Sequence, residues 1–152
     1  MADPDDIRDD SADEPDRGHQ RPAGVDDTTV AAVGKLSEAL ETAERARGHL
    51  YSFHQLTGAA DLELGEAVEL FREAGHDGIA EALQTDLVGR NVLPGRWTFQ
   101  IIEEYDDGYR ATFTALEERA RDELLDGRRH VFESEMKEER RTRGRRGHEA
   151  RP

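Results

Sequence analysis

From Val30 to about Ala74 the sequence places apolar residues at helical spacing, and this pattern constrains the fold more than any other feature. Its members are Val33, Leu36, Leu40, Ala43, Leu50, Phe53, Leu56, Ala60, Leu64, Val68 and Phe71. Steps of three and four residues predict an amphipathic α-helix, which would be about 65 Å long at 1.5 Å per residue. Gly48, Gly58 and Gly65 weaken this helix. We therefore expect a break or kink, with Gly58 as the first choice.

The remaining patterns are also helical. "DGIAEALQTDLVG" (residues 77–89) predicts a short helix, and Pro94 with Gly95 predicts a loop over residues 89–96. A second long helix is expected from Trp97 to Asp126, weakened at Gly108, and a third pattern covers residues 128–141. The apolar face of the second long helix would be Trp97, Ile101, Ile102, Tyr105, Tyr109, Phe113, Leu116, Ala120 and Leu124. We predict an all-α fold, an antiparallel bundle of about four helices (two long, two short), in one domain over residues 28–141.

Both ends of the chain are strongly charged. Residues 1–28 hold ten acids and three arginines, net −7, whereas residues 137–152 hold seven basic and three acidic residues, net +4. With few large apolar side chains, residues 1–27 are expected to be a disordered leader and 142–152 a flexible tail. The leader either neutralises the tail or leaves it solvated. A formal charge of −14 argues against nucleic-acid binding, except weakly through residues 140–151.

Composition excludes several kinds of chemistry. The sequence has no cysteine, so disulfides, thiolate metal sites and cysteine nucleophiles are excluded. No apolar run approaches the roughly 20 residues of a membrane span, and "MADPDDIRDDSADEPD" lacks the apolar core of a signal peptide. We expect a cytoplasmic protein with no membrane partner.

"HLYSFHQLTGAADLELGE" (residues 49–66) raises the question of a metal site. His54 and Asp61 share a helical face, but they lie seven residues apart, about 10.5 Å along the axis. A ligand set of His54, Asp61, Glu104 (or Glu103) and His130 can be assembled only from three helices, and spacing does not demand it. We expect no cofactor, the alternative being iron, manganese or zinc. The favoured interpretation is a partly buried His54 that hydrogen-bonds to a carboxylate or a tyrosine.

Two further groups of residues are candidates for binding. His54 and Asp61 can meet Trp97, Tyr105 and Tyr109 across the bundle, as a structural polar network or as the lining of a ligand pocket. The loop residues Arg90, Asn91 and Arg96 can clamp an anion, although a plain connector with surface ion pairs is favoured. "EEYDD" (residues 103–107) is interpreted as a solvated acidic face.

Three segments carry a resemblance: "GHLYSFHQLTGAADLELGEAVELFREAGHD", "VGRNVLPGRWTFQIIEEYDDGY" and "GRRHVFESEMKEERR". They resemble a family of small helical proteins of high-GC bacteria, with no assigned activity, over residues 34–150. The resemblance implies a bacterial cytoplasmic protein and no catalytic residue. From the residues we expect a non-enzymatic protein that acts through self-association or another protein, because long amphipathic helices exceed what a small core can cover. The alternative is a metal- or small-ligand-binding bundle, ferritin-like or hemerythrin-like.

Overall fold

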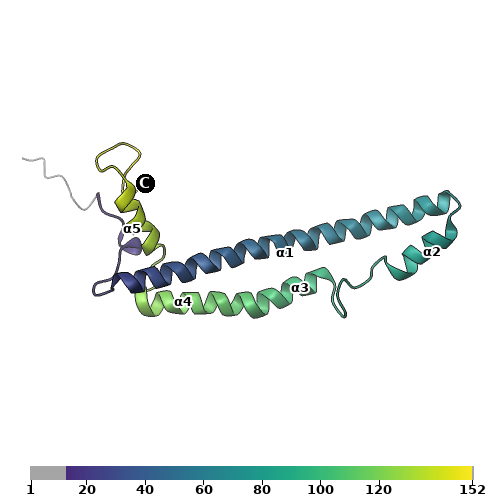
Figure 1. The fold of residues 1–152 in the computed structure, drawn as a ribbon, viewed down its shortest axis with the longest axis horizontal. Coiled ribbons are helices and arrows are strands. Elements are labelled where there is room, and N and C mark those ends of the chain that lie inside the picture. Colours follow the sequence, from purple (N-terminus) through teal and green to yellow (C-terminus); the bar gives the residue numbers. More distant parts are fainter. Residues whose placement is uncertain (1–12, 152) are drawn as a thin grey trace, which may run out of the picture. The chain divides into compact units, whose positions relative to one another are not determined.

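A computed structural model describes residues 13–151, which contain helices and no strand (Figure 1). The elements in chain order are η2 (Arg17–His19), α1 (Asp27–Glu73), α2 (Asp77–Asp86), α3 (Thr98–Tyr105), η3 (Asp106–Arg110), α4 (Ala111–Leu125) and α5 (Val131–Arg140). The short η2 is a 3₁₀-helix and η3 is a π-helix. The predicted all-α fold of antiparallel helices is confirmed. Within the described residues, no helix is both long enough and apolar enough to cross a membrane.

The chain divides into two compact units, where the sequence suggested one domain over 28–141. Of the described residues, the first unit takes in 13–40 and 114–151, and the second takes in Glu41–Phe113. Helix α1 contributes residues to both units.

Helix α1 is continuous from Asp27 to Glu73, so the predicted break near Gly58 is wrong. A glycine inside a helix costs only about 1 kcal/mol relative to alanine. On the two sides of Gly58, His54 bonds to Thr98 and Asp61 bonds to Gly89, and these contacts of α1 outweigh the cost of the glycine. A side chain at Gly58 would meet nothing within 4 Å, so the position does not require glycine for space.

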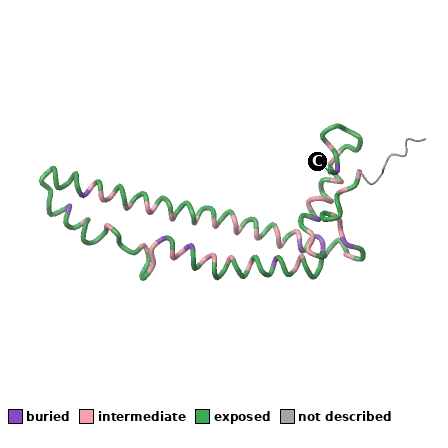
Figure 2. The backbone as a smooth tube through the Cα atoms, turned by 180° about the vertical axis from the view of Figure 1, so that it is seen from behind, coloured by how far each residue is buried: buried purple, intermediate pink, exposed green. Residues whose placement is uncertain are grey.

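In the second unit, α1 turns one narrow stripe of side chains inward. The less exposed positions recur in alternating steps of four and three: Ala43, Arg47, Leu50, His54, Thr57, Asp61, Leu64 and Val68. This is the spacing of a seam between two helices, but half of its members are polar or charged. Figure 2 shows few buried positions along α1, α2 and α3. The apolar interior of this unit is therefore thin.

Four polar contacts pair α1 with the returning chain of the second unit. Along α1 from Glu44 through Arg47 and His54 to Asp61, the partners fall in the order Arg110, Asp106, Thr98 and Gly89. The partner number falls as the α1 number rises. The two arms of the second unit, which are α1 and the chain that returns along it, therefore run antiparallel. The buried residues Thr98 and Ile102 of α3 and Ala80 of α2 lie along the returning arm.

The π-helix η3 changes which face of the second long helical segment is covered. A π-turn inserts one extra residue, so the apolar pattern predicted before it does not continue in phase after it. Tyr109, Leu116 and Leu124 of the predicted face are consequently exposed. Leu125, the neighbour of Leu124, is only 3% exposed. The expected weak point, Gly108, lies inside η3.

The first unit has a small apolar core with a tight helix contact. Val30, Val33, Leu125 and Val131 form this core, with Val25 packed against it. The buried carboxylate of Glu117 accepts hydrogen bonds from Ser37 Oγ and Arg121 Nε, each 2.8 Å long. A Cβ placed on Gly34 of α1 would lie 2.8 Å from Cβ of Phe132 in α5. Glycine is thus required at this crossing by space.

The described parts of the predicted leader and tail contact α5 and the residue after it. Arg143 of the tail lies 3.6 Å from the carboxylate of Glu138 in α5. Arg21 donates from Nε and Nη2 to Glu135, at 2.8 and 3.0 Å. Arg141, whose side chain is nearly fully buried, donates to Asp13 and to Glu138 at 2.7 and 2.6 Å. Residues 1–12 and 152, the remainder of the predicted disordered leader and flexible tail, lie outside the described residues.

We expect Gly34→Ala to destabilise the protein by about 1–3 kcal/mol, because the added methyl group collides with Phe132. Gly58→Ala is the matched control on the same helix, where an added methyl group meets nothing. It should stabilise the protein by up to about 1 kcal/mol. Urea unfolding followed by circular dichroism measures both changes. Equal stability of the two variants would contradict the close approach of α5 to α1.

Candidate functional site

The second unit contains two reciprocal ion pairs between its arms. Arg47 donates from Nε and Nη2 to the two carboxylate oxygens of Asp106, at 2.6 and 2.8 Å. Arg110 donates in the same way to Glu44, at 2.7 and 3.2 Å. Both pairs are bidentate, the strongest geometry for guanidinium and carboxylate. Each arm carries one acid and one arginine, so the arrangement specifies how the arms align.

These ion pairs shift the pKa values of all four groups. The hydrogen bonds from Arg47 hold the pKa of Asp106 below its ordinary value. Those from Arg110 do the same to the pKa of Glu44. In return, bonding to the carboxylates raises the pKa of both arginines. The four groups are therefore charged at neutral pH and have a structural role in the arms.

His54, the central candidate from the sequence, bonds to an uncharged partner. Its Nδ1 lies 2.7 Å from Oγ1 of Thr98, which is 1% exposed and begins α3. The partner is a threonine hydroxyl instead of the expected carboxylate or tyrosine. The Tyr51 ring meets the imidazole edge-on, with ring centroids 5.8 Å apart. His54 thus joins α1 to the start of α3.

Asp61 holds the loop that follows α2. Its Oδ1 accepts the backbone N–H of Gly89 at 2.8 Å, and Gly89 has a left-handed φ of 69°. Glycine adopts this conformation at little cost. The carboxylate therefore fixes the point from which the loop returns toward α3.

The other proposed metal ligands have separate surroundings. Glu104 accepts a hydrogen bond from Arg96 Nε at 2.7 Å. His130 belongs to the first unit, where it precedes α5 with a φ of 55° and its Nδ1 lies 3.9 Å from Glu133. No hydrogen bond among residues 41–113 joins His54, Asp61 and Glu104 to one another. A site for iron, manganese or zinc on these residues stays a prediction.

The aromatic candidates separate into two places. The rings of Tyr105 and Tyr109 are in contact at a tilt of 41°, with centroids 5.6 Å apart, and Tyr109 meets Phe113 edge-on at 5.9 Å. These contacts form an aromatic ladder on the returning arm, away from the hydrogen bond of His54. Trp97, by contrast, lies beside Asp61 in the wall of a cavity. Of the predicted group, only Asp61 and Trp97 lie together in the wall of a cavity.

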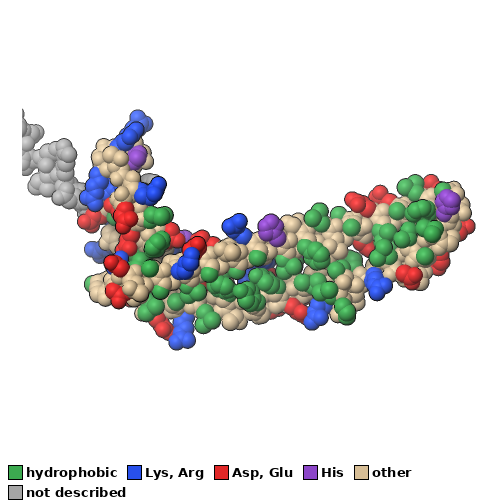
Figure 3. Space-filling model, in the orientation of Figure 1, with side chains coloured by type: hydrophobic (Ala, Val, Ile, Leu, Met, Phe, Trp, Pro, Cys, Tyr) green, Lys and Arg blue, Asp and Glu red, His purple; other side chains and the backbone are tan. Residues whose placement is uncertain are grey.

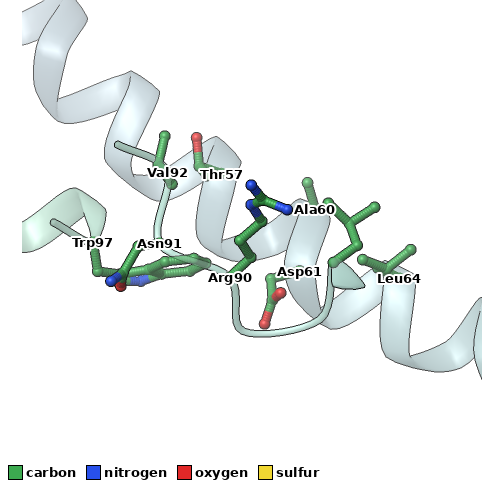
Figure 4. Close-up of a pocket in the computed structure, with 9 residues that line it drawn as sticks. Thr57, Ala60, Asp61, Leu64, Arg90, Asn91, Val92 and Trp97 are labelled. Atoms are coloured by element: carbon green, nitrogen blue, oxygen red, sulfur yellow. The ribbon is translucent and has the colours of Figure 1, made fainter. Parts of the chain in front are cut away.

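The cavity lies between α1 and the loop that joins α2 to α3, and its volume is about 460 Å³. Its walls are formed by Thr57, Ala60, Asp61, Leu64, Leu87, Arg90, Asn91, Val92 and Trp97. Figure 4 shows the Arg90 side chain extending from the loop toward Thr57 and Ala60 of α1. Of the predicted anion loop, Arg90 and Asn91 border the cavity, whereas Arg96 pairs with Glu104.

Several residues that make contacts between the two arms were not identified from the sequence. Glu44, Arg47 and Arg110 were given no role, and Thr98 was not considered a partner for His54. A signal was present: Arg47, His54, Thr57 and Asp61 interrupt the apolar repeat of α1 at seam positions. Polar residues at such positions are associated with register and partner choice.

Comparison of the chain with protein-family models, with curated proteins and with solved structures gave no match. The resemblance to a family of helical bacterial proteins therefore stays a prediction. Function has to be argued from the residues themselves.

We expect Asp106→Asn to lower the free energy of unfolding at neutral pH and to flatten its dependence on acid. The folded-state pKa of Asp106 is depressed, so the ionised carboxylate stabilises the fold above the unfolded pKa, about 3.9. This contribution disappears as pH falls through the folded value. Urea unfolding at pH 7 and near pH 3 should show a smaller loss for the variant than for the wild type. Equal losses would contradict the ion pair, and Arg47→Asp combined with Asp106→Arg should recover stability at pH 7.

Proposed function

We propose that this chain is a non-enzymatic helical protein that works by self-association, with a second copy covering apolar side chains of residues 41–113. One observation carries the proposal: this unit leaves more large apolar side chains exposed than it buries. The exposed ones are Tyr51, Phe53, Leu56, Leu62, Leu70, Phe71, Ile79, Leu87, Leu93, Phe99 and Tyr109. The buried apolar ones are Val68, Ala80 and Ile102. Extended apolar surface of this kind is typical of interaction sites.

The exposed residues of α1 support a second helix contact. Leu56 and Leu70 lie two heptads apart, and Phe53 lies three residues before Leu56, so all three share one stripe. This stripe is offset by one residue from the inward seam, with Phe53 preceding His54 and Leu56 preceding Thr57. In Figure 3 hydrophobic side chains gather along the visible face of the α1 and α2 end of this unit. A helix with two adjacent stripes can pack on its own returning arm and on another molecule.

A second copy is the partner that this surface favours. An isologous pair brings the same stripe from both molecules together, so Leu56 and Leu70 would each find apolar neighbours without any other protein. Two antiparallel arms from each copy would then form a four-helix bundle. The interior that one chain leaves thin would be completed by the other. We place this protein in the cytoplasm, in line with the absence of cysteine.

The alternative, a small-ligand-binding bundle, is favoured by the cavity beside Trp97 and Asp61. The metal-binding version has no comparable support in the second unit, because His54, Asp61 and Glu104 bond to Thr98, Gly89 and Arg96 respectively.

We expect the protein to be a dimer at micromolar concentration and Leu56→Glu to dissociate it. Leu56 is 70% exposed in one chain. Burying a leucine contributes about 1.5–3 kcal/mol, and a symmetric dimer loses two, so Kd should rise about a hundredfold or more. Size-exclusion chromatography with light scattering measures the mass.

Leu62→Glu is the matched control. Leu62 is 74% exposed on the same helix but lies off the stripe, so this variant should remain dimeric. Circular dichroism should show both variants folded. A monomeric wild type at tens of micromolar, or equal dissociation by both variants, would contradict the proposed interface.

A further inference from the structure

We propose that the cavity between α1 and residues 87–97 binds a small amphipathic anion, an aliphatic or aromatic carboxylate of modest size. The apolar body would lie against Trp97 and Leu64, and the carboxylate would bind Arg90. All of these residues line the cavity and come from one chain. The inference therefore goes beyond self-association and does not depend on it.

The size and lining of the cavity suit such a molecule. Its volume of about 460 Å³ falls within the range of roughly 300–1,000 Å³ usual for small-molecule sites. Ala60, Leu64, Leu87, Val92 and Trp97 supply the apolar wall. A few polar groups at the edge then fix the orientation of the ligand, as in most such sites.

Arg90 is the group that selects for negative charge. Its guanidinium makes one weak hydrogen bond, from Nη1 to the backbone oxygen of Asp86 at 3.3 Å. Within residues 41–113, Arg47, Arg96 and Arg110 each hold a carboxylate at 2.6–2.7 Å, whereas no carboxylate of the described residues pairs with Arg90. In a chain of formal charge −14, an arginine that borders an apolar cavity without an acidic partner can hold the carboxylate of a ligand.

Asp61 decides where in the cavity the anion can lie. One of its oxygens is occupied by the N–H of Gly89, and its negative charge repels a carboxylate placed beside it. In Figure 4 the Asp61 carboxylate and the Arg90 guanidinium point away from each other. The ligand carboxylate therefore belongs on the Arg90 side, away from the Asn91 amide, which Figure 4 shows beside Trp97. The apolar part is left to contact the indole of Trp97.

The test uses Trp97, the one tryptophan of the chain, as a reporter within the site. Octanoate, 1-octanol and octylammonium have the same apolar length but differ in charge. We expect octanoate to change the Trp97 fluorescence saturably, with a Kd about tenfold or more below those of the other two. Arg90→Gln should weaken octanoate binding about tenfold and leave octanol unchanged, because only the charged contact is lost.

Arg45→Gln is the matched control, since it removes the same charge from an exposed position on α1 of the same unit. It should bind octanoate like the wild type. No saturable response to octanoate, equal binding of octylammonium, or unchanged binding by Arg90→Gln would overturn the proposal. The titration is repeated on Leu56→Glu, which should bind octanoate as the wild type does. The experiments thus distinguish loss of the dimer from loss of the ligand site.

Discussion

The reciprocal ion pairs between Glu44 and Arg110 and between Arg47 and Asp106 are the constraint on which the second unit depends. An apolar seam of few buried side chains tolerates sliding of one helix along another, because leucine and valine contacts are similar in each register. In one bidentate pair α1 supplies the acid, and in the other it supplies the arginine, so the two pairs together tolerate no such shift. Displacement by one helical turn would place like charges together. Alignment here comes from charge, and the apolar contacts supply the attraction.

The same alignment accounts for the polar contacts farther along α1. Once Arg47 faces Asp106, the spacing of both arms brings His54 to Thr98 and Asp61 to Gly89. Each contact uses a backbone or hydroxyl group at a helix or loop boundary, so it also decides where the returning arm changes direction. The cavity lies between the last two of these contacts, where loop residues replace a helix opposite α1. The polar contacts that align the two arms and the cavity therefore lie in the same part of α1.

Local signals predicted most of the helices, and long-range pairing explains what was missed. Gly127 directly follows the end of α4, and the turn of Pro94 and Gly95 lies in the loop before α3, so both could be predicted from the sequence. The break expected at Gly58 was wrong because helix propensity was weighed without the contacts of His54 and Asp61 on either side. Thr98 as the partner of His54 depends on how two arms align, which spacing within one arm does not give. The periodic pattern also included Leu56 among apolar positions without indicating that its own chain leaves it exposed.

The π-helix at Asp106–Arg110 constrains the number of residues that this segment can contain. One residue corresponds to about 100° of helical rotation. The extra residue of the π-helix therefore changes which later residues of this segment lie on the covered face. Asp106 and Arg110, the first and last residues of the π-helix, both bond to α1, whereas Tyr109 is exposed. Sequences that share this arrangement should therefore vary in composition around Gly108 more freely than in length. A one-residue deletion there would change the spacing between Asp106 and Arg110 and so disturb both ion pairs with α1.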